Sequence, residues 1–256
     1  FVREEVAMPY DILATGRTPA LIIYLLDVSA SMSQSLGKKR RIDVVSEALT
    51  AALRQMVFRS TKGGLLSPRY RIALLAYSDH VYDIYGGIKS VDQAARIGVP
   101  ELSPMRTTDS AKAFEQAEKL LRAELAACQG CPAPLVCHMT DGEYTGSDPT
   151  PIVQRIKQLS VPDGPVLVEN IFISDKILPQ EVTDPYQWPG IMPGTKLNSD
   201  YAIKLREMSS TLPDSYRAMM LENNYHLGTG AVMMLPGTSP ELVAMGFQMS
   251  AATPVR

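Results

Sequence analysis

The chain has 256 residues, 45% of them hydrophobic and 20% charged, a balance that is typical of a globular domain with an ordinary core. Its formal net charge of −2 argues against a nucleic-acid partner and against a polybasic contact with a membrane surface. No apolar run reaches the roughly 18 residues that span a bilayer, and the opening stretch FVREEVAMPYDI lacks the order of a signal peptide.

The first half of the chain alternates buried strands with an amphipathic helix. Residues 20–26 (ALIIYLL) are apolar throughout, as parallel strands covered on both faces tend to be. Residues 41–59 carry apolar side chains at steps of three and four, which predicts a helix. A second strand is predicted over 71–77 (RIALLAY), and a Ser-Asp-His turn then leads into a hairpin partner over 81–85. The only basic run, residues 38–41, is expected to be a solvated loop and helix start.

The second half continues the same alternation. Strands are predicted over 135–139, 166–173 and 231–235. Helices are predicted over 111–127, 151–159, 201–208, 214–223 and 239–249. Residues 178–198 interrupt the pattern with four prolines and the only tryptophan, Trp188. We predict a long surface loop there, and loops of that length are usually functional or disordered.

Strands that alternate with helices predict an α/β fold with right-handed crossovers. We expect a doubly wound, mostly parallel central sheet with one antiparallel edge strand and helices on both faces. The expected organisation is an N-terminal arm over 1–19 and a single domain over 20–256. That domain contains the 178–198 loop and ends in a helix and tail over 236–256.

The three cysteines, Cys128, Cys131 and Cys137, cannot all pair with one another. An odd number without a disulfide framework favours a reducing compartment, so we expect a cytoplasmic protein. Cys128-x-x-Cys131 with Cys137-His138 also has the residue types of a zinc site. Because residues 137 and 138 fall in a predicted strand, their side chains point to opposite faces. We therefore predict reduced thiols that hold no metal.

Five side chains with oxygen donors fall at one predicted edge of the sheet. They are Asp27, Ser29, Ser31, Thr108 and Asp141. The first three follow the first strand in DVSAS, the threonine lies in TTDS ahead of a helix, and the last aspartate follows a later strand in TDGE. Open parallel sheets bind ligands at the carboxyl ends of their strands. We expect the neighbouring acids Asp109 and Glu143 to be solvated or to cap a helix.

The donor types in this cluster point to a hard divalent cation. Hydroxyl and carboxylate oxygens without histidine or thiolate suit Mg²⁺, Mn²⁺ or Ca²⁺ rather than zinc or copper. Few carboxylates with several hydroxyls favour Mg²⁺, an octahedral ion that keeps some of its water. The charges of Asp27 and Asp141 just balance such an ion. It therefore stays electrophilic and can accept an anionic oxygen from another molecule.

In chain order the cluster consists of three motifs, namely Asp27-x-Ser29-x-Ser31, the Thr108 loop and Thr140-Asp141-Gly142. This arrangement resembles the metal-ion-dependent adhesion site (MIDAS) of von Willebrand factor A (vWA) domains. The resemblance covers roughly residues 20–235, including the order of strands and helices and the antiparallel edge. The remainder is most similar to bacterial intracellular members, including those of tellurium-resistance type encoded near kinases and phosphatases.

The resemblance implies a role for each of the five residues. Ser29, Ser31 and Thr108 would contact the metal directly, and Asp27 and Asp141 directly or through water. Family members often have glycine before that threonine, whereas this chain has Arg106-Thr107. Thr107 therefore stays an alternative to Thr108.

The resemblance also implies a metal-dependent protein–protein interaction module rather than an enzyme. An Asp or Glu of another protein, from a kinase- or phosphatase-associated bacterial system, would complete the coordination of Mg²⁺. The alternative is a homo-oligomer that uses the same site between copies, with the 178–198 loop and the arm over 1–17 free to reach out. A metal-dependent phosphatase with Asp27 as nucleophile is less favoured. Position 29 is serine where a second acid is expected, and no lysine directly follows Asp141.

Overall fold

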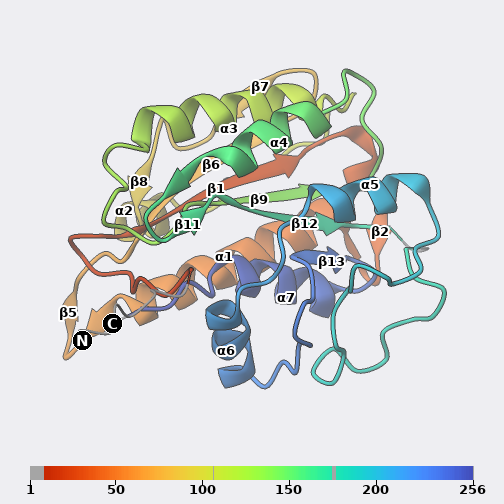
Figure 1. The fold of residues 1–256 in the computed structure, drawn as a ribbon. Helices are drawn as coiled ribbons and strands as arrows, with labels where there is room; N and C mark the ends of the chain where they lie inside the picture. Colours follow the sequence, from red (N-terminus) through yellow and green to blue (C-terminus); the bar gives the residue numbers. More distant parts are fainter. Residues whose placement is uncertain (1–8, 106, 175–176, 256) are drawn as a thin grey trace.

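The structure is a computed structural model that describes residues 9–105, 107–174 and 177–255. Its centre is a seven-stranded sheet in the order β13-β12-β9-β1-β6-β7, with β8 also paired to β6 (Figure 1). The strands of this sheet are β1 (Ala20–Asp27), β6 (Tyr70–Tyr77), β7 (Val81–Asp83), β8 (Lys89–Ser90), β9 (Leu135–Thr140), β12 (Leu167–Phe172) and β13 (Met234–Pro236).

Parallel pairing dominates the sheet. The strand β1 pairs in parallel with β6 on one side and β9 on the other, and β9, β12 and β13 follow in parallel. At the other edge, β7 and β8 run antiparallel to β6. The predicted mostly parallel sheet with an antiparallel edge is therefore confirmed. The last strand starts later than the predicted 231–235, because the Val232 amide bonds to the Ile191 carbonyl in the long loop.

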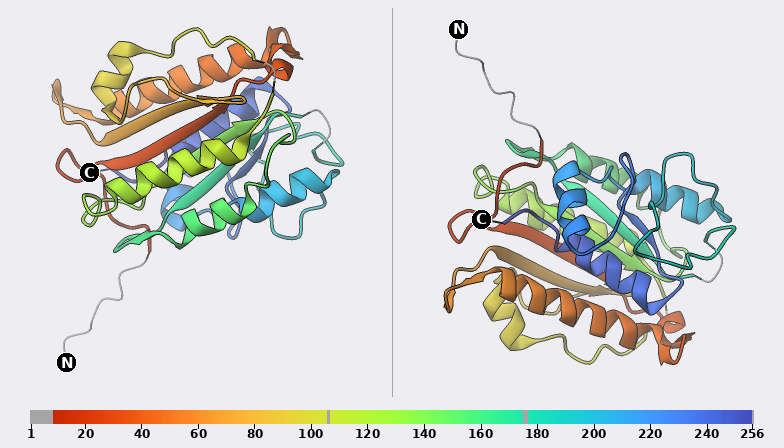
Figure 2. Two further views of the ribbon diagram at one scale, coloured as in Figure 1. Left: turned by 90° about the horizontal axis from the view of Figure 1, so that it is seen from above. Right: turned by 90° about the horizontal axis from the view of Figure 1, so that it is seen from below.

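Helices cover both faces of the sheet, as predicted. Figures 1 and 2 show α3, α4 and α5 on one face and α1, α6 and α7 on the other. The helices are α1 (Arg41–Arg59), α2 (Val91–Ile97), α3 (Ser110–Glu124), α4 (Thr150–Gln158), α5 (Asp200–Met208), α6 (Asp214–Glu222) and α7 (Pro240–Ser250). The first of these has the bounds that its apolar spacing predicts.

Several short elements were not predicted. They are α2, the 3-10 turn η1 (Ala30–Ser33) and the hairpins β2 (Ser35–Leu36) with β3 (Lys39–Arg40), β4 (Thr61–Lys62) with β5 (Leu65–Leu66), and β10 (Ser160–Val161) with β11 (Gly164–Pro165). Two-residue strands are too short to show a hydrophobic period. The seven-residue α2 begins with a capping box formed by Ser90 and Gln93, which stabilises it locally.

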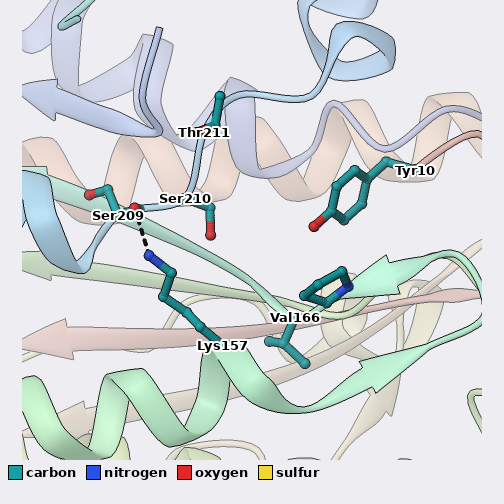
Figure 3. A pocket seen from close by; sticks show the side chains of 7 residues that line it. Tyr10, Lys157, Val166, Ser209, Ser210 and Thr211 are labelled. Atoms are coloured by element: carbon teal, nitrogen blue, oxygen red, sulfur yellow. Dashed lines mark hydrogen bonds between the residues drawn. The ribbon is translucent and has the colours of Figure 1, made fainter. Parts of the chain in front are cut away.

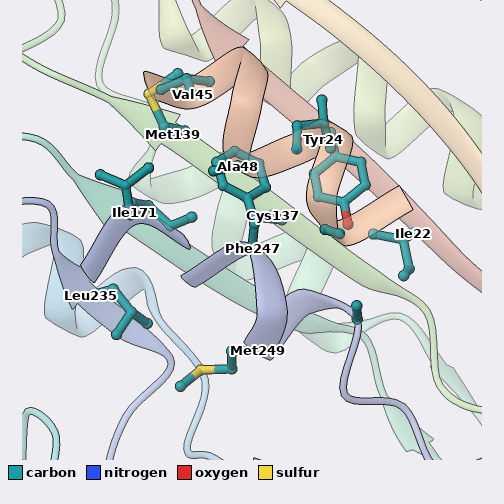
Figure 4. Close-up of a cluster of buried hydrophobic side chains, with 14 of the residues drawn as sticks. Ile22, Tyr24, Val45, Ala48, Cys137, Met139, Ile171, Leu235, Phe247 and Met249 are labelled. Atoms are coloured by element: carbon teal, nitrogen blue, oxygen red, sulfur yellow. The ribbon is translucent and has the colours of Figure 1, made fainter. Parts of the chain in front are cut away.

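Alternate residues of β1 serve the two layers of the core. Ile22, Tyr24 and Leu26 face α1 and α7, whereas the odd-numbered residues between them face α3 and α4. On the α7 side, the ring centroids of Tyr24 and Phe247 lie 5.9 Å apart, and both side chains are fully buried (Figure 4). Burial on both faces explains why β1 reads as a continuous apolar run.

The described parts of the arm and of the 178–198 loop are bonded to the domain. The amide of Ala14 donates to the Pro254 carbonyl, and that of Tyr10 to the Asp163 carbonyl. In the loop, the Tyr186 ring stacks on Tyr225 with centroids 4.9 Å apart. Residues 9–17 and the loop are therefore held in place rather than free to reach out, while residues 1–8 of the predicted arm lie outside the described residues.

The three cysteines are free and buried on different sides of the sheet. Cys128 and Cys131 lie under α3, whereas Cys137 faces α7 on the opposite side. His138 points away from Cys137 and packs on Phe114 of α3, with ring centroids 4.8 Å apart. The sheet therefore separates Cys137 from the other three side chains that a zinc site would need. Within the described residues, no helix is long and apolar enough to cross a membrane.

One carboxyl group is buried in the middle of the sheet. Glu169 of β12 lies beside Cys137 in the register and is fully buried on the α7 side. Neither of its oxygens has a hydrogen-bond partner among the described residues. Burial raises the pKa of Glu169 well above its ordinary value, because the charged form loses its hydration.

We expect Glu169→Gln to remove a pH-dependent loss of stability. A carboxyl group with a raised pKa in the folded state stabilises that state fully below its unfolded pKa of about 4.3, and the contribution is lost as the pH rises towards the folded value. Between pH 5 and pH 8 the wild type should therefore lose up to about 1.4 kcal/mol per pH unit relative to the glutamine variant. Urea unfolding of both proteins at the two pH values measures this. If the difference in unfolding free energy between the two proteins is the same at both pH values, burial does not shift the pKa of Glu169.

Candidate metal centre

Backbone hydrogen bonds join three loops at the carboxyl end of the sheet. The Met105 amide donates to the Val28 carbonyl over 2.5 Å, which ties the loop before α3 to the loop after β1. The Thr145 amide donates to the Thr108 carbonyl over 2.8 Å, which ties the same loop to the one after β9. The three motifs predicted from the sequence therefore lie side by side.

Asp27, the last residue of β1, is fully buried at this edge. Its Oδ1 accepts a hydrogen bond from the Ser29 amide at 2.8 Å, and its Oδ2 accepts one from the Thr140 hydroxyl at 2.7 Å. Burial raises the pKa of Asp27 to about 6, and these two hydrogen bonds oppose that rise. Thr140 was not among the predicted site residues, although it stands in the quoted TDG motif.

Two serine hydroxyls converge on the second aspartate. Ser29 Oγ and Ser31 Oγ lie 3.0 Å apart, and Ser31 Oγ donates to Asp141 Oδ1 at 2.6 Å. Ser29 Oγ is 3.4 Å from the same carboxylate oxygen. Two loops separated by more than a hundred residues thus place three oxygen atoms around one point. These hydroxyl and carboxylate oxygens are the donors that a hard divalent cation prefers.

Thr108 lies in the adjoining loop and is buried, whereas Thr107 is exposed. The difference favours Thr108 as the inward-facing hydroxyl, while Arg106 lies outside the described residues. Among the described residues, no hydrogen bond joins the Thr108 hydroxyl to the other four predicted residues. The structure therefore brings together Asp27, Ser29, Ser31 and Asp141 through hydrogen bonds, and places Thr108 beside them through its backbone.

Asp109 and Glu143 lie outside the oxygen cluster, in line with the expectation that they cap a helix or are solvated. Asp109 accepts a hydrogen bond from the Lys112 amide and caps α3. A Cβ atom at Gly146 would lie 2.9 Å from the Asp109 carboxyl group, so a larger residue there would displace this capping side chain. Glu143 is exposed. It lines a cavity of about 320 Å³ together with Tyr144, Asp200, Tyr201 and Lys204.

Arg41 is a site residue that the sequence analysis placed wrongly. The 38–41 run was expected to be solvated, and Lys39 and Arg40 are indeed exposed and pair with Glu47 and Asp43. Arg41 is instead buried, and its Nη1 lies 3.0 Å from Asp141 Oδ2. A run of four basic residues carries no sign that its last member turns inward, because that depends on where α1 meets the sheet.

Buried aromatic hydroxyls lie beneath the site. Tyr77 bonds to His138 Nε2 at 2.7 Å, and His138 Nδ1 lies 2.8 Å from Asn170 Oδ1. Tyr201 is also buried, and its hydroxyl has no partner among the described residues. Burial raises the pKa of Tyr201, and the nearby Asp27 carboxylate raises it further. All these hydroxyls are therefore neutral donors or acceptors at pH 7.

Another cavity, of about 330 Å³, lies at the opposite end of the sheet. It is lined by residues that include Tyr10, Lys157, Val166 and Ser209 (Figure 3). The Lys157 ammonium group donates to the Ser209 carbonyl at 3.0 Å, which joins α4 to the end of α5. Because Val166 precedes β12, this cavity is at the amino end of the strands and takes no part in the oxygen cluster.

Comparison with known proteins finds a family model that is similar to part of the chain. Residues 22–143 match the family model described as von Willebrand factor type A domain. That range contains all five predicted site residues. No match was found among curated proteins.

Several solved structures share the fold at low identity. The PilB minor pilin from Streptococcus sanguinis aligns with 93% of this chain and 62% of its own, with a TM-score of 0.55 and 10% identity. Proximal thread matrix protein 1 from the mussel byssus aligns over 91% of this chain and 47% of its own, with a TM-score of 0.52 and 14% identity. This chain therefore spans less than two thirds of either protein.

The conserved hypothetical protein BatB from Bacteroides thetaiotaomicron is similar in length as well. It aligns over 91% of this chain and 98% of its own, with a TM-score of 0.50 and 14% identity. At such identities the likeness shows the fold alone. The match over residues 22–143, together with the sheet order and the helices on both faces, makes this chain similar to von Willebrand factor type A domains.

Proposed function

We propose that this domain binds another protein through a divalent cation held at the oxygen cluster. The ligands in this proposal are Asp27, Ser29, Ser31, Thr108 and Asp141. The observation that carries it is the convergence of two serine hydroxyls on Asp141 Oδ1 at the carboxyl edge of the sheet. Mg²⁺ fits best, because it accepts few carboxylates and keeps water, with Mn²⁺ and Ca²⁺ as alternatives.

The partner group follows from the charges. The proposed ligand set contains only two carboxylates, and its three hydroxyl groups add no charge. A bound cation would supply an electrophilic position that an Asp or Glu of the partner can fill. Such a charge-assisted contact, shielded from solvent, is stronger than a surface ion pair.

Binding is favoured over catalysis by the residues around Asp27. A phosphatase that used this aspartate as nucleophile would need a second acid and a cation to hold phosphate. Ser29 and Gly142 stand at the two positions where the sequence analysis looked for these groups. Two structures with this fold are, by name, a thread matrix protein and a minor pilin, which fits a role in assembly or binding.

The same proposal includes a cytoplasmic, bacterial setting with a kinase- or phosphatase-associated partner. Its support is the resemblance of the motifs to intracellular members and the presence of three free, buried thiols. Self-assembly through the same site is the alternative, with a neighbouring copy supplying the acid. Light scattering with and without chelator distinguishes the two.

The first test concerns the metal. Asp27→Asn and Asp141→Asn should each abolish Mg²⁺ binding in calorimetry. Asparagine has the shape of aspartate, but each substitution removes one of the two negative charges that balance the cation. The fold should persist, as judged by circular dichroism, because an asparagine oxygen can still accept one of the hydrogen bonds that each carboxylate accepts. Asp148→Asn is the matched control. Its carboxylate lies in the loop after β9 but pairs with Lys204, so Mg²⁺ binding should not change. Unchanged binding in both site variants would refute the proposed ligands.

The second test concerns the partner. Chelator should release a captured partner and added Mg²⁺ should restore it. Removing one member of the coordinated, desolvated contact between ion and acid typically costs about 2–5 kcal/mol, some 30-fold to several-thousand-fold in affinity. Thr108→Ala should also weaken binding while it leaves the fold intact. Thr107→Ala is the control, because Thr107 is the exposed neighbour of the buried Thr108. If a partner binds equally well in chelator and to the Thr108→Ala protein, this edge of the sheet is not the binding surface.

A further inference from the structure

A buried ion pair lies directly behind the proposed metal site. The side chains of Arg41 and Asp141 are 10% and 0% exposed, and Nη1 lies 3.0 Å from Oδ2. The Arg41 Nε is buried without a hydrogen-bond partner among the described residues. An arginine that is buried but incompletely bonded is costly to the fold.

The two oxygens of Asp141 face different groups. Oδ1 faces the hydroxyls of Ser29 and Ser31, and Oδ2 faces the guanidinium of Arg41. A cation that replaces the hydrogen bonds between the serines and Oδ1 would therefore leave the ion pair of Arg41 with Oδ2 in place. Arg41 does not occupy the site but adds a fixed positive charge close to it.

We infer that Arg41 makes Mg²⁺ binding at this site depend on an anionic group supplied by the partner. The inference rests on the proposed function and goes one step beyond it. With Asp27 and Asp141 charged, the site alone carries two negative charges, and Arg41 reduces that to one. When Mg²⁺ binds, the site carries a net charge of plus one, and a carboxylate from the partner neutralises it.

The consequence is a coupling between the two ligands. The buried Arg41 charge repels the ion with little screening by salt, so the ion binds weakly by itself. A carboxylate that binds next to the ion removes the excess charge and strengthens its binding. By linkage, the ion strengthens the binding of the carboxylate by the same factor. Arg41 thus selects an acidic partner together with the metal.

Calorimetric titration of the full chain with MgCl₂ tests this directly. Arg41→Gln keeps an N–H donor for Asp141 but removes the charge, so Mg²⁺ should bind about tenfold more tightly or better. Arg41→Lys keeps the charge and should remain close to the wild type. Arg40→Gln is the matched control, because Arg40 is exposed and pairs with Asp43, and it should also resemble the wild type.

A second arm uses acetate as a probe for the partner carboxylate. Replacing sodium chloride by sodium acetate at equal ionic strength should strengthen Mg²⁺ binding to the wild type severalfold, and less so to Arg41→Gln. If the glutamine variant fails to fold, the acetate titration of the wild type tests the inference by itself. Equal Mg²⁺ affinity of wild type and Arg41→Gln, or no effect of acetate on the wild type, would overturn the inference while the proposed metal site stands. Absence of Mg²⁺ binding in the wild type and in every variant would overturn both.

Discussion

The parallel pairing of β1 with β9 is the constraint on which the site depends. The register places Leu26 opposite Met139, so Asp27 is level with Thr140 and Asp141 follows one residue later. Two aspartates that are far apart in the chain therefore leave the sheet at the same edge. The hydrogen bond from Thr140 to Asp27 is a direct result of that register. A one-residue slip would move these side chains to the opposite face.

Bringing two carboxylates to a buried edge is unfavourable unless their charges are balanced. Asp27 is stabilised by neutral donors, the Ser29 amide and the Thr140 hydroxyl. Asp141 is stabilised by the full charge of Arg41. The two aspartates therefore differ in environment although the motif presents them as equivalent. Neutral donors leave the negative charge of Asp27 available to a cation. The positive charge of Arg41 partly neutralises the negative charge of Asp141.

The surroundings of the site also limit how a partner can approach. The 178–198 loop is bonded to residues 226–232, and residues 10–14 are bonded to Asp163 and Pro254. Neither segment is therefore available in its described part to extend towards another molecule. The surface next to the cluster is formed instead by the loop after β9 and the start of α5, where Glu143, Tyr144 and Tyr201 line a cavity.

Local patterns in the sequence were enough for the architecture and for most of the candidate site. The apolar run of β1 and the three- and four-residue spacing of α1 each reflect burial within one element, and they predicted the strand and the helix closely. The motifs around Ser29, Thr108 and Asp141 were recognisable because each follows a strand or precedes a helix. Only the tertiary structure decided that Arg41 turns inward, that Thr140 holds Asp27, and that the proline-rich loop is fixed. These three features depend on contacts between segments distant in the chain, and no local period or motif records such contacts.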